Sequence, residues 1–462
     1  MLTDQDIAGA KEFYERARLL AVAGREVESR AVFAEAVQAC PKAFQDPEIL
    51  VHFQREVLDG PTTRAYYRFF AEYNRYLNLI LTDCPLLGGV GPSLSSAQES
   101  LIERILAEYE GQWETGALTP AKSGVYDVSG PVHTPDAAVI VCGKHISLSP
   151  RCIESDLHIH LSRTLSQVCP RTTVFYGEDL LYDPLKLPDI TRTPADLNNA
   201  LAGLEEHVRR ERPELVVLEA NFIGCDRSIT REDMARLKAA YGFKLVALIP
   251  DLYPPIDNFA LYWAPVSDLI LSYFDGEYLA AASKLGRTAA FPSLCFDPAC
   301  FTSAQLIAPE VDVTYVGSRA RMRDMFCAHL EGTGLSTRIR FTNRVIKYAL
   351  TWPEYFTAFR RAKMTLNSGL APSGVNILTG RSFEAILSGS LLLQHETPAL
   401  RDYLAPFIHY VPFLNVPQMV AFARYFAKHE DRRLRIVERA GAFVADRYAP
   451  ERHWRRVFKE VF

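Results

Sequence analysis

A run of glycine, serine and arginine residues past the middle of the chain could bind an anion. Gly317 and Ser318 end an apolar stretch and precede a predicted helix, in the sequence VGSRARMRD. Backbone N–H groups at such a junction, together with the helix dipole, favour a negatively charged group. Arg319, Arg321 and Arg323 add guanidinium donors, which suit phosphate oxygens. Since a helix start directs at most two of them towards one ligand, we expect Arg319 and Arg323 to bind the anion.

Titratable side chains follow the strands of an earlier predicted sheet and could act as a general acid or base. Asp251 directly follows the apolar run KLVALIP, and ligands of parallel sheets bind beyond the carboxyl ends of the strands. A carboxylate there can accept a proton from a hydroxyl group. Glu219 and Asn221 end the preceding strand, and His145 follows the first one. Asp251 can equally be a turn residue before LYPP, so both interpretations stay open.

The segments that must position these residues alternate between short apolar strands and amphipathic helices. The first series has strands at 137–143, 172–177, 214–220, 244–250, 268–274 and 288–293, with helices near 155–168, 195–211, 231–240 and 276–285. The second series has strands at 312–318, 336–342, 363–368, 390–395 and 409–413, with helices at 321–332, 353–362, 380–388 and 398–403. Continuous apolar strands separated by helices indicate parallel sheets covered on both faces. We therefore predict an α/β fold with two tandem Rossmann-like domains and a substrate cleft between them.

The first 120 residues carry a helical pattern only. The spacing of a tetratricopeptide helix pair is matched by Phe13, Ala17, Leu20, Gly24, Ser29, Phe33, Ala36 and Pro41. Further helical segments at 49–58, 62–81 and 95–111 do not repeat that pattern, and a linker is expected at 111–135. We expect an all-α, tetratricopeptide-like region at 1–120, followed by α/β domains at 121–305 and 306–462. An ordinary helical cap on a neighbouring domain is the alternative.

The composition argues against several classes of protein. The 462-residue chain has 51 Lys and Arg against 55 Asp and Glu, a formal net charge of −4, which disfavours binding to the nucleic-acid backbone. No signal peptide or membrane-spanning segment is expected, and nine cysteines without a C-x-x-C pair fit buried reduced thiols. These features predict a cytoplasmic protein. His158 and His160 stand two residues apart on a predicted helix, which disfavours a metal site there.

The ordered segments resemble the nucleotide-sugar glycosyltransferases of the GT-B fold over about residues 135–460. The resemblance is carried by KLVALIPDLYPP, FALYWAPVSDLILSYF, AAFPSLCFDPACF and VTYVGSRARMRD. The segments LTWPEYF, KMTLNS and LTGRSFEAILSGSLLLQHE, with Trp454 in the closing helix, are similar to the CgeB-like, spore-maturation branch of that superfamily. The resemblance implies transfer of a sugar from a nucleotide diphosphate to an acceptor hydroxyl group.

The resemblance also implies roles for residues of the second series. In related retaining enzymes the second glutamate of an E-x7-E pair binds the ribose diol, and Glu384 matches it. Asn376 stands where the first glutamate, the contact with the donor sugar, is expected. Arg381 is a further candidate for phosphate or sugar. The expected donor-binding residues are Gly317, Ser318, Arg319, Arg323, Asn376, Arg381 and Glu384. Arginines are expected to neutralise the diphosphate, so no metal ion or other cofactor is expected.

Catalysis on the acceptor side is expected from Asp251, His145 and Glu219. Related retaining enzymes often carry His and then Asp at the bend that holds Asp251, whereas Pro250 stands before it in this chain. Helical-repeat modules bind peptides or proteins, so the expected acceptor is a bacterial protein such as a flagellin. A cell-envelope polysaccharide or lipid-linked glycan is the alternative acceptor.

Two further interpretations remain open at this point. A UDP-sugar epimerase shares the two-domain architecture and needs no acceptor. A non-catalytic adaptor built on the same fold would fit the departures at Asn376 and Pro250. A dinucleotide-dependent dehydrogenase is disfavoured, because neither first strand leads into G-x-G-x-x-G.

Overall fold

The computed structural model describes two compact units of the chain. The described residues are 93–142, 156–177, 194–220, 228–249, 258–272, 282–290, 295–301, 308–317, 321–341, 352–369, 378–413 and 416–462, with a few single positions besides. One unit combines the described residues up to Ser123 with those of 304–341 and 357–443, and the other combines those of 124–303, 342–356 and 444–462. Each unit is built from segments that are not contiguous in the sequence. The domain boundaries predicted at 120 and 305 therefore stay predictions. The tetratricopeptide-like pattern between Phe13 and Pro41 lies almost entirely outside the described residues.

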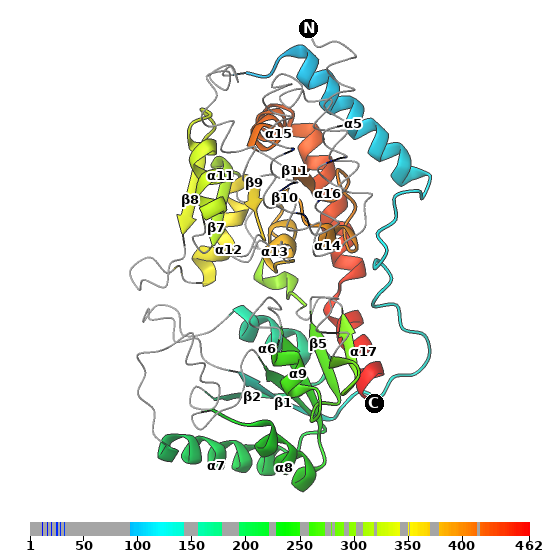
Figure 1. Cartoon of the computed structure of the whole chain (residues 1–462), viewed down its shortest axis with the longest axis vertical. Helices are drawn as coiled ribbons and strands as arrows, with labels where there is room; N and C mark the ends of the chain where they lie inside the picture. Colours follow the sequence, from blue (N-terminus) through cyan, green and yellow to red (C-terminus); the bar gives the residue numbers. More distant parts are fainter. Residues whose placement is uncertain are drawn as a thin grey trace. The chain divides into compact units, whose positions relative to one another are not determined.

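The first sheet has six parallel strands in the order β2-β1-β3-β4-β5-β6. The strands are β1 (Ala137–Cys142), β2 (Arg171–Tyr176), β3 (Leu215–Glu219), β4 (Lys244–Ile249), β5 (Leu269–Ser272) and β6 (Thr288–Ala290). The helices of this unit include α6 (Asp156–Val168), α7 (Pro194–Glu211), α8 (Arg231–Tyr241), α9 (Asn258–Trp263) and α17 (Pro450–Val461). Figure 1 labels β1, β2 and β5 of this sheet, together with the helices α6, α7, α8, α9 and α17 of the same unit. Every residue of β1 is buried, and Val139 and Val141 pack with residues of α7 and α8. Because Ala138 and Ile140, which point the other way, are equally buried, the sheet is covered on both faces, as predicted.

The second sheet has five parallel strands in the order β11-β10-β9-β7-β8. They are β7 (Val311–Gly317), β8 (Thr337–Phe341), β9 (Ala362–Asn367), β10 (Leu391–His395) and β11 (Val411–Phe413). The helices of this part of the chain are α11 (Arg321–Glu331), α12 (Trp352–Arg360), α13 (Arg381–Leu387), α14 (Pro398–Arg401), α15 (Val416–Lys428) and α16 (Glu430–Arg447). The two parallel sheets confirm the prediction of two Rossmann-like α/β elements in tandem.

Helix α5 (Ser96–Glu114) precedes the first sheet in sequence but belongs to the core around the second one. The apolar face of α5 packs with residues of α15 and β11. This face consists of Ile102, Ile105, Leu106 and Tyr109. A capping box starts the helix, since the Ser95 hydroxyl accepts from the Gln98 backbone N–H and the Gln98 side chain accepts from the Ser95 N–H. The helix is therefore part of the folded unit that contains β7–β11.

The predicted end of this helix at Gly111, and with it the start of the predicted linker, was wrong. The helix continues to Glu114, and the Trp113 ring lies edge-on to His409 at 4.9 Å and to Phe443 at 5.9 Å. These aromatic contacts stabilise one more helical turn beyond Gly111, although glycine is a weak helix former. Tertiary packing thus overrides the local stop signal.

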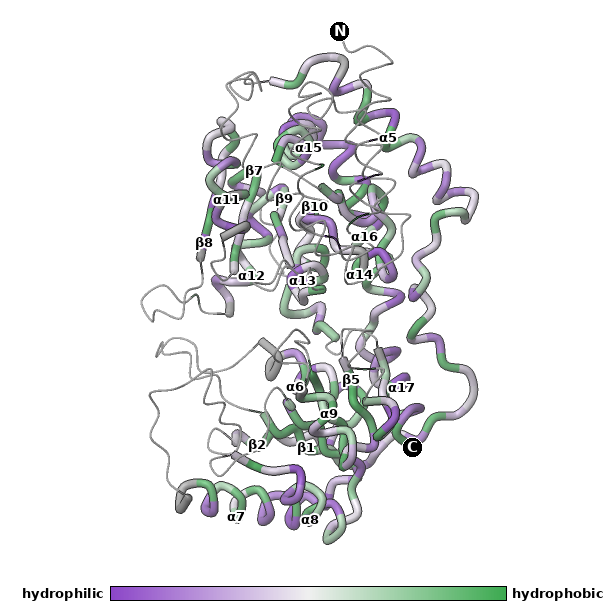
Figure 2. The backbone as a smooth tube through the Cα atoms, viewed as in Figure 1, coloured by the Kyte–Doolittle hydropathy of each residue, from purple (hydrophilic) through white to green (hydrophobic). Residues whose placement is uncertain are grey.

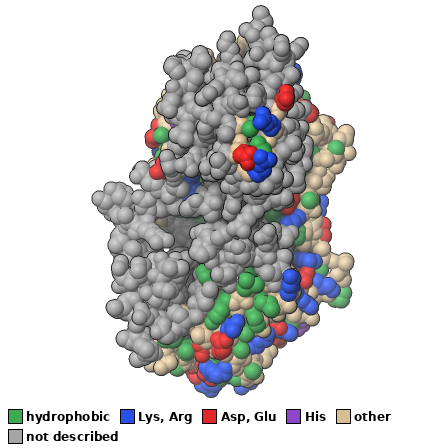
Figure 3. Space-filling view, viewed as in Figure 1, with side chains coloured by type: hydrophobic (Ala, Val, Ile, Leu, Met, Phe, Trp, Pro, Cys, Tyr) green, Lys and Arg blue, Asp and Glu red, His purple; other side chains and the backbone are tan. Residues whose placement is uncertain are grey.

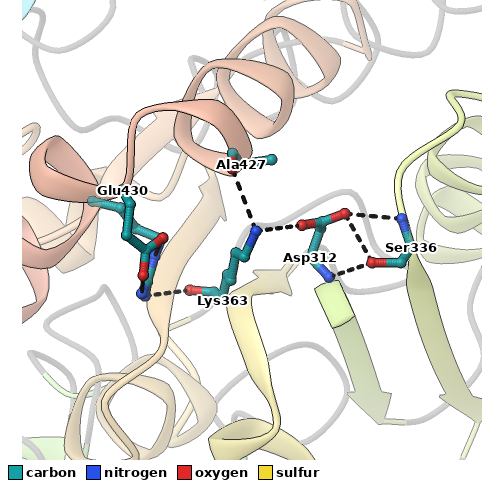
Figure 4. Close-up of polar contacts among 6 residues, drawn as sticks. Asp312, Ser336, Lys363, Ala427 and Glu430 are labelled. Carbon is teal, nitrogen blue, oxygen red and sulfur yellow. Dashed lines mark hydrogen bonds and ion pairs between the residues drawn. The ribbon is translucent and has the colours of Figure 1, made fainter. Parts of the chain in front are cut away.

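A cluster of paired charges joins the amino ends of β7, β8 and β9 (Figure 4). Asp312 Oδ1 lies 2.9 Å from Lys363 Nζ, and Asp312 Oδ2 accepts from the Ser336 backbone N–H at 3.0 Å and its hydroxyl at 2.8 Å. The buried Arg433 guanidinium pairs with Glu430 and donates to the Lys363 carbonyl oxygen at 3.2 Å. The cluster ties three strands to α16 at the end of the sheet opposite to the strands' carboxyl ends.

The surface of the unit that contains β1–β6 carries charges of both signs. Figure 2 shows polar and apolar residues alternating along α7, and Figure 3 shows Lys, Arg, Asp and Glu side chains interspersed near the foot of the view. Arg209 pairs with Glu206 at 2.7 Å, and Arg236 pairs with Glu205 at 3.0 Å. Exposed ion pairs of this kind contribute little stability. The ion pairs mark the solvent-facing side of α7 and α8, whereas Leu204, Val208, Met234 and Leu237 pack with residues of the sheet.

Candidate functional site

The strands β7 and β9 flank the topological switch point of the second sheet. From β7 the chain moves to one side to form β8, and then to the other side to form β9, β10 and β11. In sheets of this type ligands bind beyond the carboxyl ends of the strands at the switch point. Gly317 ends β7 and Asn367 ends β9. The predicted anion-binding glycine therefore lies at the position where this fold binds ligands.

Arg381, the first residue of α13, lies against the end of β7. Its Nη1 atom donates to Asn367 Oδ1 at 2.9 Å, and its Cζ atom lies 5.5 Å from the centroid of the Tyr315 ring. A Cβ atom added to Gly317 would lie 2.7 Å from Arg381 Cζ and 2.9 Å from Tyr315 Oη, closer than real Cβ contacts. The side chain of Arg381 thus occupies the space that the absence of a Cβ at Gly317 leaves open. Two predicted donor-binding residues are in direct contact.

Arg323 brings a second guanidinium group to the same end of the sheet. It lies in α11, and its Nε atom donates to the carbonyl oxygen of Ser368 at 2.9 Å. Burial raises the pKa of the Tyr315 hydroxyl, and the positive charges of Arg381 and Arg323 act in the opposite direction. Both cations therefore lie close to this hydroxyl. The switch point consequently carries two positive charges near the Tyr315 hydroxyl, and one of them, Arg381, lies next to Gly317.

Behind Arg381 lies a buried network of uncharged polar groups. Asn367 Nδ2 donates to Thr379 Oγ1 at 3.0 Å, to Ser382 Oγ at 3.1 Å and to Gln394 Oε1 at 2.8 Å. The Ser382 hydroxyl also donates to Gln394 Oε1 at 3.1 Å. Sequence reasoning did not single out these four residues. For Asn367 and Gln394 the available signal was a polar residue near the end of an otherwise apolar strand, in KMTLNS and SLLLQHE.

Three titratable groups lie in α13 and at the end of β10. Glu384, in the first turn of α13, is only 2% exposed. Burial lowers the pKa of His395 to about 3, so its ring is neutral at pH 7, with Nδ1 3.4 Å from Ser368 Oγ. Burial raises the pKa of Glu396 to about 8, although the charge of Arg401 acts in the opposite direction. The carboxyl group of Glu396 is therefore largely protonated at neutral pH.

The structure places the other predicted site residues as follows. Glu219 ends β3 and is partly buried, beside the switch point between β1 and β3 of the first sheet. The remaining predicted residues lie outside the described part of the chain, and they are Asp251, His145, Asn221, Ser318, Arg319 and Asn376. Their roles stay predictions.

The unit that contains β1–β6 holds a buried histidine, His160, which is one of the two histidines considered in the sequence. His160 lies in α6, and its Nδ1 atom accepts from the Asp297 backbone N–H at 3.3 Å. Within the described ranges, no three His, Cys, Asp or Glu side chains are grouped so that they could hold a metal ion. Among the helices that are described, none is long and apolar enough to cross a membrane.

Residues 305–459 match the family described as "Glycosyl transferase-like". The matched segment includes all of β7 to β11 and therefore the switch point with Gly317, Arg323 and Arg381. This part of the chain is thus glycosyltransferase-like, as the resemblance of its motifs predicts. A comparison with curated protein sequences finds no match.

Several solved structures are similar to larger parts of the chain. HepE from Anabaena, in complex with UDP and glucose, is 11% identical with a TM-score of 0.45, over 70% of this chain and 98% of that one. Sucrose-phosphate synthase from Thermosynechococcus elongatus is 11% identical with a TM-score of 0.45, over 71% and 99%. A glycosyltransferase from Rickettsia africae is 10% identical with a TM-score of 0.43, over 70% and 98%. Because these identities and TM-scores are low, we assign the fold from the strand order of the chain's own two sheets.

Proposed function

We propose that the chain is a GT-B-type glycosyltransferase that moves a sugar from a nucleotide diphosphate to an acceptor hydroxyl group. One observation carries the proposal. The glycosyltransferase-like segment contains a topological switch point at which Arg381 lies beside Gly317 and Arg323 lies near the Tyr315 hydroxyl. The similarity of the C-terminal motifs to the CgeB-like branch supports the same proposal.

The two arginines bind the diphosphate of the donor in this proposal. Guanidinium groups that are already oriented stabilise the charge that develops on the leaving nucleotide without further rearrangement. Glu384 accepts hydrogen bonds from the ribose diol. Ser318, Arg319 and Asn376 complete the donor site, and no metal ion is needed to neutralise the phosphates.

The acceptor hydroxyl group is activated from the first sheet. Asp251 is the proposed general base, and His145 and Glu219 are the other candidates, because all three follow or end strands of that sheet. A base must come within hydrogen-bond reach of the proton that it removes. Separate substitutions of these three residues, assayed with a bound donor, identify the one whose loss abolishes transfer but not donor binding.

A panel of nucleotide sugars tests the proposed activity. The purified chain is heated with UDP-, GDP-, CDP- and dTDP-sugars, and a donor that binds raises the melting temperature. The donor is then incubated with the chain, and release of the nucleoside diphosphate is measured. Binding followed by release is the expected result. Binding without release indicates an adaptor, conversion to an epimeric sugar nucleotide indicates an epimerase, and no binding by any donor contradicts the donor site itself.

The proposed acceptor is a bacterial protein such as a flagellin, recruited in the cytoplasm by the residues that precede α5, for which the sequence predicts a tetratricopeptide-like helical region. The test compares the full chain with one that begins at residue 93, because α5 belongs to the core of the unit around β7–β11. Loss of transfer to protein with unchanged donor hydrolysis supports recruitment. Equal transfer by both chains, or transfer to an envelope glycan instead, contradicts it.

A further inference from the structure

We propose that Asn367 is a positioning residue, which holds the Arg381 guanidinium group over the end of β7 and thereby sets the affinity for a diphosphate. The inference deepens the proposed function and rests on it. It assigns a role to a residue that the sequence did not single out within the segment KMTLNS and that does not itself need to contact the donor.

Asn367 connects three elements from a fully buried position. It ends β9, its Cα atom is in register with that of Gln394 on β10, and its exposed fraction is 0%. Its amide nitrogen donates to Gln394 and Ser382, while its amide oxygen accepts from Arg381. A buried amide whose bonds are all made fixes the groups around it, whereas one with missing bonds is costly.

The direction of these hydrogen bonds is fixed by a backbone carbonyl group. Gln394 Nε2 donates to the His395 carbonyl oxygen at 2.8 Å and to Thr397 Oγ1 at 3.0 Å. A carbonyl oxygen can only accept, so the amide oxygen of Gln394 must face the other way, towards Asn367. Asn367 must then present its NH₂ group to Gln394, at 2.8 Å. The Asn367 oxygen is left to face Arg381, which can only donate.

This arrangement gives Arg381 one preferred orientation. An arginine side chain has many rotamers, and its planar fork binds phosphate oxygens well only when it is already oriented. The bond from Nη1 to Asn367 Oδ1, at 2.9 Å, and the contact with the Tyr315 ring hold the guanidinium group at the end of β7. The Asn367 amide oxygen is uncharged, so this bond orients the guanidinium group without itself forming an ion pair.

The test is a double-mutant cycle on ligand affinity. Wild type, Asn367→Ala, Arg381→Ala and the double variant are titrated calorimetrically with UDP, with UMP and with inorganic pyrophosphate, which carries no base. We expect Asn367→Ala to raise the Kd for UDP by about tenfold, the scale of one hydrogen bond to a charged group. Since Asn367 acts through Arg381, its substitution should have no further effect on Kd in the Arg381→Ala background. The ratio of the Kd for UMP to the Kd for UDP should change from its wild-type value in the same direction in Asn367→Ala and in Arg381→Ala.

A second residue of β9 supplies the matched control. Thr365 is equally buried, and its hydroxyl donates to Ser390 Oγ at 2.8 Å. Thr365→Val therefore removes a buried hydrogen bond from the same strand and should leave the three Kd values unchanged. If Asn367→Ala does not fold, Gln394→Met replaces it, since that variant keeps Asn367 but removes the groups that orient its amide. Gln394→Met should then raise the Kd for UDP by a smaller factor.

The outcomes separate the inference from the proposed function. Additive effects of the Asn367 and Arg381 substitutions, or an equal rise in Kd for Thr365→Val, would overturn the positioning role. An unchanged Kd in Asn367→Ala, with a raised Kd in Arg381→Ala, overturns the inference but leaves the donor site standing. If wild type binds neither pyrophosphate nor any nucleoside diphosphate, the proposed donor site itself is wrong.

Discussion

The two ends of the second sheet differ in the partners of their charged side chains. At the amino ends, Lys363 pairs with Asp312, and Arg433 pairs with Glu430. At the carboxyl end, Arg381 donates to the side-chain oxygen of Asn367. The ion pairs join strands to one another and to α16, whereas the hydrogen bond from Arg381 to the Asn367 oxygen orients a cation at the end of β7. The comparison predicts that substitutions at the amino ends change stability and that substitutions at the carboxyl ends change ligand affinity.

The largest effect is expected from the groups at the carboxyl ends. Arg323→Ala and Glu384→Ala should each weaken binding of the donor by roughly 1.5 to 3 kcal/mol, the scale of a hydrogen bond to a charged group. Titration with the nucleoside diphosphate measures the change. Lys363→Met, from the opposite end of the same sheet, is the control and should leave this affinity unaltered. Unchanged affinity in both site variants would remove the assignment of the donor site.

A smaller effect is expected from a single methyl group at the end of β7. Gly317→Ala places a Cβ atom where Arg381 and the Tyr315 hydroxyl now lie, so the guanidinium group must move. We expect the Kd for the nucleoside diphosphate to rise several-fold, with a modest loss of stability. Gly332→Ala is the matched control, because a Cβ atom there meets only ordinary contacts at 3.5 Å or more. Equal affinities of the two variants would show that the position of Arg381 does not matter for binding.

The charged cluster at the amino ends of β7, β8 and β9 should make the stability of the fold depend on pH. Burial alone would raise the pKa of Asp312, but hydrogen bonds from Lys363 and Ser336 outweigh burial and lower it. A carboxylate with a lowered pKa stabilises the fold above its unfolded-state pKa of about 4, and this contribution disappears as the pH falls through the folded-state pKa.

Asp312→Asn should therefore reduce the free energy of unfolding at pH 7 by about 1 kcal/mol, and the difference from wild type should shrink below about pH 4. Urea unfolding at a series of pH values measures it. A difference that stays constant down to acidic pH would mean that the charge of Asp312 is not the source of its contribution.

The smallest expected effect is that of removing metal ions. Because arginines bind the diphosphate in the proposed site, EDTA should leave the rate of nucleoside diphosphate release unchanged. The assay is run with and without EDTA and with added manganese. Complete loss of activity in EDTA, restored by manganese, would contradict a donor site built on arginines alone.

Local patterns predicted the sheets well. The strand expected at 390–395 is β10 at Leu391–His395, and that expected at 137–143 is β1 at Ala137–Cys142. Continuous apolar runs define such strands without help from distant residues. The end of α5 was missed, because its last turn depends on contacts of Trp113 with residues some three hundred positions later.

The candidate site was also predictable only in part, because local motifs can be recognised in a sequence but contacts between distant residues cannot. Gly317 and Arg381 stand in recognisable motifs, and the structure brings them together. Asn367 and Gln394 were missed, because their partnership depends on the register between β9 and β10. A single sequence carries no information about which residues of two distant strands face each other.

The place of α5 in the core also has a consequence for synthesis of the chain. The Tyr425 hydroxyl donates to Glu103, a partner 322 residues away, and the apolar face of α5 packs against elements that are translated equally late. When α5 leaves the ribosome, Ile102, Ile105 and Leu106 still lack the surface that covers them. These three residues therefore have no partners from α15 or β11 while the first sheet is made, and transiently exposed apolar surface of this kind makes folding intermediates prone to aggregation. A ribosome stalled before α15 would leave this apolar stripe uncovered.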